Sequence, residues 1–386
     1  MYNRYLEKPL KGSQSFFLLG PRGTGKTSWL KSQIPNGLYI DLLNQETFFY
    51  LLQNPHRLER LIPKGFDDWV IIDEVQKIPD LLNEVHRLIE GARTRFILTG
   101  SSARTLKRKG VNLLAGRALY YKMFPLTAVE LGDDFQLPRS LKYGHLPTVY
   151  SQAIDPKEYL KAYIHIYLRE EVMQEGLVRN AGSFSRFLEV ASFSQGSLLN
   201  ISKVAKEVGC ERKTIEEYFQ IAEDLLLATR LPVFTKRAKR RMLSHPKFYY
   251  FDVGVYRHLR PMGPFDKPEE AEGPALESLA LQEIQAINSY LDLEYEIYFW
   301  RTTTGLEVDF VLYGPKGLIG IEVKRSKKIE TDDLKGLKAF QSDYPMAKLY
   351  ILYGGEKTLH FDGITAMPFE KALKSLQLLL GRTLDD

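Results

Sequence analysis

The chain has 386 residues, of which 44% are hydrophobic and 26% are charged, values that are ordinary for a globular protein of about two to four domains. It contains no run of about 18 uncharged apolar residues, its N-terminus does not read as a signal peptide, and its single Cys210 excludes an internal disulfide or a multi-cysteine zinc site. We therefore expect a cytoplasmic protein without membrane association, and the net charge of +5 is too mild to identify a partner.

The most informative segment is residues 20–27, Gly-Pro-Arg-Gly-Thr-Gly-Lys-Thr, which follows an apolar strand pattern at 16–19 and precedes a helix-compatible segment. The backbone N–H groups of such a turn converge on a polyphosphate, and its glycines permit dihedral angles that a Cβ would forbid. Lys26 would reach the β- and γ-phosphates, and the Thr27 hydroxyl would bind Mg²⁺. The alternative is a glycine-rich turn that binds nothing. We expect an ATP site formed by Gly20, Pro21, Arg22, Gly23, Thr24, Gly25, Lys26, Thr27 and Ser28.

Two acids follow the next apolar run. Residues 69–72 are all apolar and predict a strand buried on both faces of a parallel sheet. Asp73 and Glu74 then emerge at the C-terminal end of that strand, where ligands bind in open α/β sheets. We expect Asp73 to hold Mg²⁺ and Glu74 to polarise the attacking water. The alternative is that both acids only cap the next turn.

A third buried strand is expected at 95–100, and a strand at 37–42 completes an alternation that predicts a parallel sheet with helices on both faces. Ser101 follows the third strand and could contact the γ-phosphate, or it could cap a helix. Arg117 is a candidate arginine finger that would stabilise transition-state charge, or it is a surface arginine near a strand.

The middle of the chain reads as helical. Apolar spacing predicts a helix over 155–178, and Ser183 could cap the next one. Residues 201–210 and 211–218 read as two short helices separated by a tight turn, with a possible wing strand at 231–234, which is a helix-turn-helix outline.

The charges of this region leave its partner open. The second short helix carries two cations, Arg212 and Lys213, but also three acids that would repel phosphate, so DNA contact and a structural or protein-docking role both remain. Two basic clusters favour nucleic acid, although such clusters also occur as solvated surface. They consist of Lys236, Arg237, Lys239, Arg240 and Arg241, and of Arg104, Lys107, Arg108 and Lys109.

After a linker at 260–264, the C-terminal third alternates again. An amphipathic helix is expected at 275–284, then strands at 307–312 and 317–324, then a helix from Thr331 to about 340 and a strand at 347–353.

Three acids and a lysine in this third form a second candidate site. A period of two places Glu322 and Lys324 on the same face of their strand, and a hairpin would bring Asp309 beside Glu322. Asp309 and Glu322 could hold Mg²⁺, Lys324 could position or help deprotonate a water, and Glu277 could add a carboxylate from the helix.

This order of Glu, Asp and Glu-x-Lys resembles the PD-(D/E)xK nuclease superfamily, and the chain as a whole resembles a family of prokaryotic AAA-type ATPases fused to a C-terminal region of unknown function. The resemblance implies a nucleotide-binding fold with an inserted catalytic strand, a winged-helix segment and a restriction-endonuclease-like end. Besides the P-loop, the segments that carry it are residues 71–76, 98–102, 114–117, 248–254, 307–310 and 322–324.

We thus predict an α/β protein with an AAA-type P-loop ATPase domain (1–135), a helical linker or lid (136–183), a winged-helix-like domain (184–262) and a PD-(D/E)xK nuclease-like domain (263–386). The predicted function is ATP hydrolysis with Mg²⁺, action on DNA, and a nuclease-like domain under ATP control. Arg117 would then act across subunits of a homo-oligomer. The alternative is an ATP-dependent signalling or docking switch whose nuclease-like fold is inactive.

Overall fold

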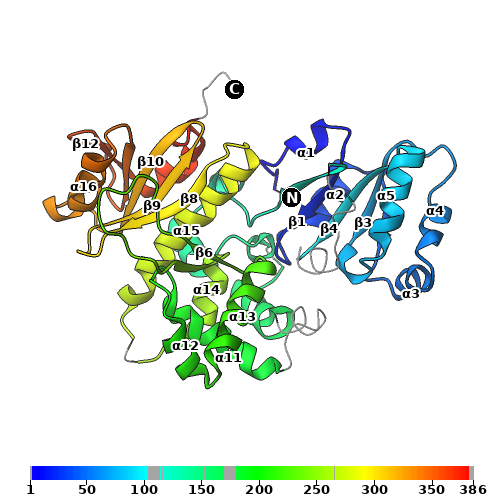
Figure 1. The fold of residues 1–386 in the computed structure, drawn as a ribbon, viewed down its shortest axis with the longest axis horizontal. Coiled ribbons are helices and arrows are strands. Elements are labelled where there is room, and N and C mark those ends of the chain that lie inside the picture. Colours follow the sequence, from blue (N-terminus) through cyan, green and yellow to red (C-terminus); the bar gives the residue numbers. More distant parts are fainter. Residues whose placement is uncertain are drawn as a thin grey trace. The chain divides into compact units, whose positions relative to one another are not determined.

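The computed structural model describes residues 2–102, 114, 116–151, 153–168, 180–264 and 266–381 (Figure 1). It divides into two compact units, which we describe one at a time. The N-terminal unit is Asn3–Phe124 with Asp224–Leu227, and the C-terminal unit consists mainly of Pro125–Glu223 and Ala228–Asp386. The finer division into four domains stays a prediction. Within the described ranges, no helix combines the length and the apolar character that crossing a membrane requires.

The N-terminal unit is built on a parallel sheet with the strand order β2-β3-β4-β1-β5, which confirms the predicted α/β fold with a parallel sheet. Strand β4 lies between β1 and β3, as the inserted strand implied by the resemblance should. The strands are β1 (Ser15–Leu19), β2 (Leu38–Asp41), β3 (Trp69–Asp73), β4 (Arg95–Gly100) and β5 (Ala118–Lys122).

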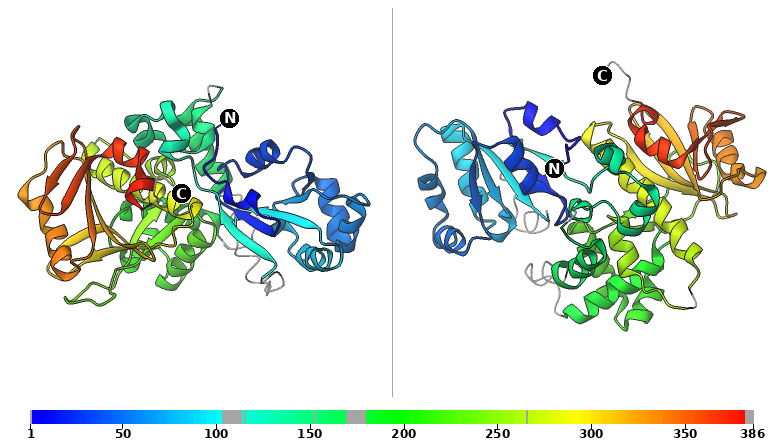
Figure 2. Two further views of the ribbon diagram at one scale, coloured as in Figure 1. Left: turned by 90° about the horizontal axis from the view of Figure 1, so that it is seen from above. Right: turned by 180° about the vertical axis from the view of Figure 1, so that it is seen from behind.

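Alternating side chains bury both faces of this sheet. Phe17, Val70 and Leu98 belong to one core cluster with apolar side chains of α3, α4 and α5, while Phe16 and Ile71 are buried on the opposite face. Figure 2 shows the strands of this unit between helices. The helices are α1 (Lys8–Lys11), α2 (Lys26–Gln33), α3 (Gln45–Gln53), α4 (Leu58–Leu61) and α5 (Leu81–Ala92).

The first part of the C-terminal unit is helical. Its helices are α7 (Ala128–Leu131), α8 (Leu137–Tyr143), α9 (Pro156–Ala162) continued by a π-helical stretch (Tyr163–Leu168), α11 (Ala181–Ala191), α12 (Ile201–Val208), α13 (Arg212–Asp224) and α14 (Val253–Leu259). The helix expected at 155–178 is therefore described only as far as Leu168, and the basic cluster from Arg104 to Lys109 lies outside the described residues.

Two boundaries in this part differ from the prediction. The cap of α11 is Asn180 and not Ser183, because the Asn180 side chain accepts the N–H of Ser183 and the helix has already begun. The strand expected at 231–234 is β6 (Ala228–Leu231), which pairs antiparallel with β7 (Lys247–Tyr250). The helices α11–α13 followed by this hairpin have the element order expected of a winged helix, but that assignment stays a prediction.

The second part of the C-terminal unit is a mixed six-stranded sheet in the order β12-β13-β11-β10-β9-β8. Strands β8 to β10 are antiparallel, whereas β11 runs parallel to both β10 and β13. Its elements are α15 (Pro268–Tyr290), β8 (Glu296–Arg301), β9 (Glu307–Gly314), β10 (Gly317–Lys324), α16 (Lys335–Asp343), β11 (Lys348–Tyr353), β12 (Leu359–Phe361), β13 (Ile364–Pro368), α17 (Phe369–Lys374) and α18 (Leu376–Leu379). Strands β8, β12 and β13 were not predicted, and α15 extends beyond 275–284 in both directions.

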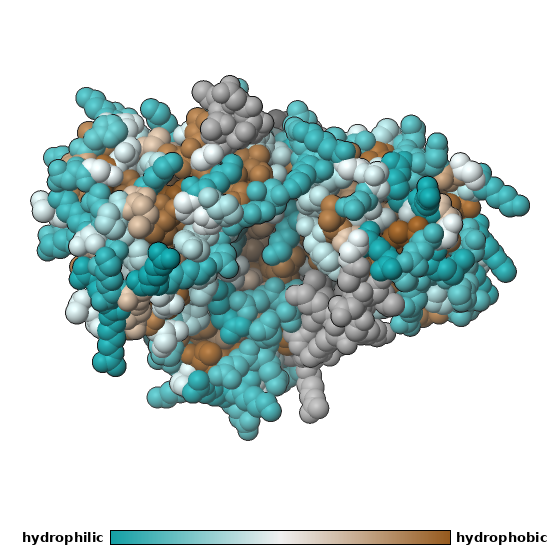
Figure 3. Space-filling model, turned by 45° about the horizontal axis from the view of Figure 1, so that its top comes forward, coloured by the Kyte–Doolittle hydropathy of each residue, from teal (hydrophilic) through white to brown (hydrophobic). Residues whose placement is uncertain are grey.

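Hydrophilic residues cover most of the face drawn in Figure 3, with hydrophobic residues visible between them in patches.

The buried interior of the C-terminal unit also contains polar groups. The Asp252 carboxylate caps α14 by accepting the N–H of Val255 at 3.0 Å and also accepts the N–H of His145 at 2.8 Å. His145 in turn contacts Ser140 and Glu283, all of them fully buried, so this network ties α8, α14 and α15 together.

Gly254 is required by this packing. A Cβ at Gly254 would lie 2.1 Å from the Tyr143 carbonyl oxygen, so Gly254→Ala should lower the free energy of unfolding of the C-terminal unit by about 3 kcal/mol. Gly273→Ala is the control: nothing lies within 4 Å of its Cβ position on α15, and alanine there should stabilise the helix by up to about 1 kcal/mol. Hydrogen exchange in urea, followed peptide by peptide, measures both, and equal protection in the two variants would contradict this reasoning.

Candidate functional site

The P-loop joins β1 to α2, and its shape depends on glycine. The Gly20 N–H donates to the Gly100 carbonyl oxygen at 3.2 Å, and a Cβ on Gly20 would lie 2.3 Å from the Met123 carbonyl oxygen. Gly23 and Gly25 have φ angles of +83° and +89°, in the left-handed region that glycine adopts without strain. Gly25 is the N-cap of α2, so the positive end of that helix begins directly after the loop.

Two side chains that the sequence assigned to nucleotide and metal binding begin α2. Lys26 is 6% exposed, and its ammonium donates to the carbonyl oxygens of Gly20 at 2.7 Å and Pro21 at 3.2 Å, so it lies folded over the loop. The Thr27 hydroxyl donates to Oδ2 of Asp73 at 2.7 Å. Ser28, the last residue of the predicted set, is exposed on the first turn of α2.

Asp73 lies at the C-terminal end of β3 and accepts hydrogen bonds on both oxygens. Oδ2 is bound by Thr27, and Oδ1 accepts the hydroxyl of Thr99, a residue of β4 that the sequence reasoning missed. A hydroxyl and a carboxylate so close together fit the oxygen ligands that Mg²⁺ prefers, with waters to complete its shell. The fold therefore brings Thr27 of the P-loop and Asp73 of β3, the two residues predicted to bind the Mg²⁺ of the nucleotide, together across 46 positions.

Glu74, directly after Asp73, has an unusual backbone and an ordered side chain. Its φ of +59° lies in the left-handed region, which is uncommon for a residue with a Cβ. Its carboxylate accepts a hydrogen bond from the amide of Gln76, and that same amide also donates to the Ser101 hydroxyl at 3.2 Å. Gln76 thus links the residue expected to polarise water to the residue expected to contact the γ-phosphate. Sequence reasoning assigned no role to Gln76; its only signal was its position two residues after Glu74.

Arg117 does not join this group. Its guanidinium pairs with Glu90 of the same chain, with an Nη2–Oε1 distance of 2.5 Å, and its side chain is 40% exposed. It directly precedes β5, whose first residue, Ala118, pairs with Ser15 at the start of β1. The P-loop follows the other end of β1, which places Arg117 about 15 Å from it along the strand direction.

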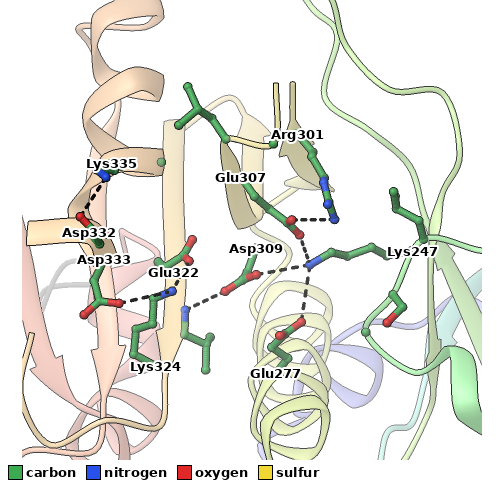
Figure 4. Close-up of a pocket in the computed structure, with 17 residues that line it drawn as sticks. Lys247, Glu277, Arg301, Glu307, Asp309, Glu322, Lys324, Asp332, Asp333 and Lys335 are labelled. Atoms are coloured by element: carbon green, nitrogen blue, oxygen red, sulfur yellow. Dashed lines mark hydrogen bonds and ion pairs between the residues drawn. The ribbon is translucent and has the colours of Figure 1, made fainter. Parts of the chain in front are cut away.

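The C-terminal unit contains a second charged site, a pocket of about 740 Å³ (Figure 4). Four cationic side chains line it, which are Lys247, Arg301, Lys324 and Lys335. Six acids line it as well, which are Glu277, Glu307, Asp309, Glu322, Asp332 and Asp333. The structure thus brings together all four residues that the sequence assigned to a nuclease-like site: Glu277, Asp309, Glu322 and Lys324.

The predicted hairpin explains how two of the acids meet. Strands β9 and β10 pair antiparallel with Phe310 opposite Ile321, so Asp309 and Glu322 come next in register. Oδ2 of Asp309 accepts the backbone N–H of Val323 at 2.9 Å, which fixes this carboxylate against β10. Glu322 and Lys324 share a face, as period two requires, and their Oε1 and Nζ atoms are 3.0 Å apart.

A lysine that the sequence reasoning missed lies among the carboxylates. The Nζ of Lys247, on β7, is 2.5 Å from Glu307, 3.3 Å from Asp309 and 3.6 Å from Glu277, and the residue is 2% exposed. Tyr249, two residues further on the same face of β7, donates its hydroxyl to Glu277 at 3.0 Å. The signal that could have identified Lys247 was its position as the one charged residue of an aromatic strand, with Tyr249 two residues further on the same face.

This lysine changes the expected metal site. Among the described residues, no group of three or more His, Cys, Asp or Glu side chains is arranged to hold a metal ion. The assignment of Glu277, Asp309 and Glu322 to a metal ion therefore stays a prediction. In the structure, the ammonium group of Lys247 lies 3.6 Å from the carboxylate of Glu277 and 3.3 Å from that of Asp309.

Burial and mutual repulsion shift the pKa values of this cluster. Burial, together with the Asp309 charge, raises the pKa of Glu277 to about 7. The same two causes raise the pKa of Glu322 well above its ordinary value, with Lys324 opposing them. Burial lowers the pKa of Lys247, but Tyr249 and the surrounding carboxylates outweigh it, and the net pKa lies well above the ordinary value. Lys247 is therefore charged at neutral pH.

Comparison with known proteins gives three family matches along the chain. Residues 12–132 match an AAA domain, residues 134–266 match a domain of unknown function (DUF8612), and residues 272–372 match another domain of unknown function (DUF4143). The first match, on the segment that contains the P-loop and the parallel sheet, supports a P-loop ATPase domain.

An uncharacterized protein of Haemophilus influenzae is 24% identical over 287 residues, which are 66% of this chain and 72% of that protein. Among solved structures, the Orc1 protein of Aeropyrum pernix in complex with DNA is 13% identical, with 66% of this chain and 89% of that chain covered and a TM-score of 0.24. Protein VC1899 of Vibrio cholerae is 10% identical, and the match covers 96% of this chain and 97% of that chain with a TM-score of 0.23. At such TM-scores, neither structural likeness supports an inference about this chain.

The raised pKa of Glu277 predicts a pH dependence of stability. Because the folded chain binds its proton more tightly, the contribution of Glu277 to stability is full below its ordinary pKa of 4.5 and is lost as the pH rises to about 7. In the variant Glu277→Gln, the free energy of unfolding should not show this loss between pH 4.5 and 7. The loss amounts to up to about 3 kcal/mol, since one pKa unit corresponds to about 1.4 kcal/mol. Urea unfolding between pH 4.5 and 8 measures it. Glu270→Gln, on the exposed side of α15, should keep the wild-type profile, and a matching change in both variants would contradict the assignment.

Proposed function

We propose that the chain is a Mg²⁺-dependent ATPase whose catalytic site is formed by the P-loop, Asp73 and Glu74. The observation that carries this proposal is the hydrogen bond between Thr27 and Asp73, because it brings a hydroxyl of α2 and a carboxylate of β3, both able to bind Mg²⁺, next to the P-loop. Mg²⁺ bound there would neutralise charge on the β- and γ-phosphates.

The remaining residues of the site have distinct roles in this proposal. Lys26 would exchange the Gly20 and Pro21 carbonyl oxygens for phosphate oxygens, since its ammonium already lies over the loop that would hold them. Glu74 would orient and polarise the attacking water. Gln76 would hold Glu74 in place and, through Ser101, connect its position to the presence of the γ-phosphate.

Arg117 fits this proposal only as a residue that acts on a neighbouring copy. Its position at the opposite ends of the strands keeps it away from its own P-loop, and the pair with Glu90 would have to open before it reached a phosphate. A homo-oligomer remains part of the proposal on this ground.

The catalytic assignments predict two different losses. Lys26→Ala should abolish ATP binding and hydrolysis, because the loop loses its only lysine. Glu74→Gln should keep ATP binding within about twofold and lower kcat by about 10²- to 10⁴-fold, the usual contribution of a group that activates water. Titration calorimetry with ATP and a phosphate-release assay separate the two effects. Normal turnover by Glu74→Gln would remove Glu74 from the mechanism.

Gln76 gives a finer prediction. Gln76→Leu should lower kcat by about tenfold with little change in KM for ATP, because the variant keeps the side-chain volume but releases the Glu74 carboxylate. Gln33→Leu, at the exposed end of α2, is the matched control and should retain wild-type kinetics. If both variants behave alike, Gln76 is not a positioning residue.

We further propose nucleic acid as the partner of the C-terminal unit, through the basic loop, which is residues 232–246 between β6 and β7. All five cationic side chains of this loop are exposed, namely Lys236, Arg237, Lys239, Arg240 and Arg241. Two of them are engaged within the chain: Lys236 pairs with Glu296, and Arg240 pairs with Asp343 at 2.7 Å. Arg237, Lys239 and Arg241 are therefore the cations best able to contact phosphate.

A protein-docking switch is the second candidate function, and α13 favours it. Arg212 of that helix pairs with Glu216 at 3.1 Å, so one of its two cations is already neutralised by a neighbour on the same exposed face. Such a helix suits a protein surface better than a phosphate backbone.

A salt titration distinguishes the two. If the basic loop binds DNA, the triple variant Arg237→Ala, Lys239→Ala, Arg241→Ala should bind DNA more weakly. The slope of the logarithm of the binding constant against the logarithm of the salt concentration should become less steep by about two to three, because each lost phosphate contact releases about one counterion fewer. The control Lys203→Ala, Lys206→Ala, on the exposed side of α12, should leave the slope unchanged. Absence of binding at 50 mM salt would favour the docking switch.

A further inference from the structure

The carboxylate cluster of the C-terminal unit holds a permanent positive charge of its own. Lys247 enters it from β7, whereas Glu307 and Asp309 come from β9 and Glu277 from α15 (Figure 4). Its Nζ lies within 3.6 Å of all three carboxylates, so the ammonium takes the position that a cation shared by these acids would need. The lysine itself is 2% exposed, whereas the side chains of Glu277 and Glu307 are 22% and 23% exposed to the pocket.

The backbone contacts of β7 fix the point from which the Lys247 side chain enters the cluster. The N–H of Gly196 donates to the carbonyl oxygen of Phe248 on β7 at 2.8 Å. The N–H of Leu199 donates to the carbonyl oxygen of Pro246, directly before β7, also at 2.8 Å. On the other side, Lys247 pairs with Leu231 of β6. Withdrawing the side chain by moving the strand would break this pairing and expose its buried residues.

Three of the acids around Lys247 already have partners, whereas Oε2 of Glu322 is buried without a hydrogen-bond partner among the described residues. Asp309 accepts Lys247 on Oδ1 and the Val323 N–H on Oδ2. Glu307 is shared between Lys247 and Arg301, whose Nη1 is 3.0 Å away, and Glu277 also accepts the Tyr249 hydroxyl. A divalent ion needs oxygen ligands at about 2.1 Å in a near-octahedral arrangement, and an ion shared by Glu277, Glu307 and Asp309 would overlap the ammonium.

The lysine that the nuclease resemblance would assign to water is also engaged. Lys324 lies 3.0 Å from Glu322 and 3.7 Å from Asp333. Counted as fully ionised, the residues that line the pocket carry two more negative charges than positive ones, and without a bound metal ion this excess does not attract a phosphodiester.

We propose that Lys247 is an internal cation that replaces the divalent metal of this carboxylate cluster, so that the C-terminal site binds no catalytic metal and cleaves no phosphodiester bond. The lysine holds β7 against α15 and β9, and the cluster has a structural and electrostatic role. This proposal is independent of ATP hydrolysis at the P-loop.

The test is metal binding to nucleotide-free protein in a Thr27→Ala background, which removes the P-loop hydroxyl from the measurement. Lys247→Met keeps the length of the side chain but removes its charge, and it should acquire one Mn²⁺ site by titration calorimetry, at least tenfold tighter than any Mn²⁺ binding of the parent. Adding Asp309→Asn should abolish the new site. Mn²⁺ should also raise the Tm of Lys247→Met and leave the Tm of the parent unchanged.

The parent protein provides a second measurement that does not depend on the folding of Lys247→Met. Any Mn²⁺ heat and any Mn²⁺-dependent cleavage of plasmid DNA that the parent shows should be unchanged by Asp309→Asn. Mn²⁺ binding or cleavage by the parent that is lost in Asp309→Asn would overturn the proposal. A folded Lys247→Met protein that binds no Mn²⁺ would overturn it as well, because the cluster would then not be a metal position at all.

Discussion

The hydrogen bonds on the Asp73 carboxylate hold the N-terminal site together. One oxygen accepts Thr27 from α2 and the other accepts Thr99 from β4, so a single side chain at the end of β3 connects the P-loop helix to the neighbouring strand. This is possible because β1, β4 and β3 are adjacent and parallel, and their C-terminal ends meet at the same edge of the sheet. Glu74 then follows Asp73 through a left-handed turn, and Gln76 holds its carboxylate near Ser101.

The C-terminal site meets a different electrostatic demand. Ionised carboxylates are costly to bury unless a cation compensates them, and a bound metal and a lysine are two ways of supplying one. Lys247 supplies it from within the chain and at a fixed position, whereas the Thr27–Asp73 pair presents oxygen ligands at a loop built to approach phosphate. In our two proposals, the sites therefore have opposite relations to metal, and the difference comes from the strand residue Lys247.

Charge compensation also governs α13 and the basic loop. Arg240 of the basic loop pairs with Asp343, and Arg212 of α13 pairs with Glu216, so a count of cations in the sequence overstates the charge available to a partner. Both proposals for the C-terminal unit follow from this balance: Arg237 and Lys239 favour nucleic acid, and the neutralised helix favours a protein.

The sequence by itself determined the parallel sheet, the P-loop, and the strand positions of Asp73, Asp309 and Glu322, because periodicity, glycine spacing and buried apolar runs are local properties. It could not determine the partners of those residues. Lys247 reaches Asp309 across 62 positions, and only the packing of β7 against β9 and α15 brings them together. The tertiary structure also decided the pairing of Arg117 with Glu90, since no local pattern encodes which distant charges become neighbours.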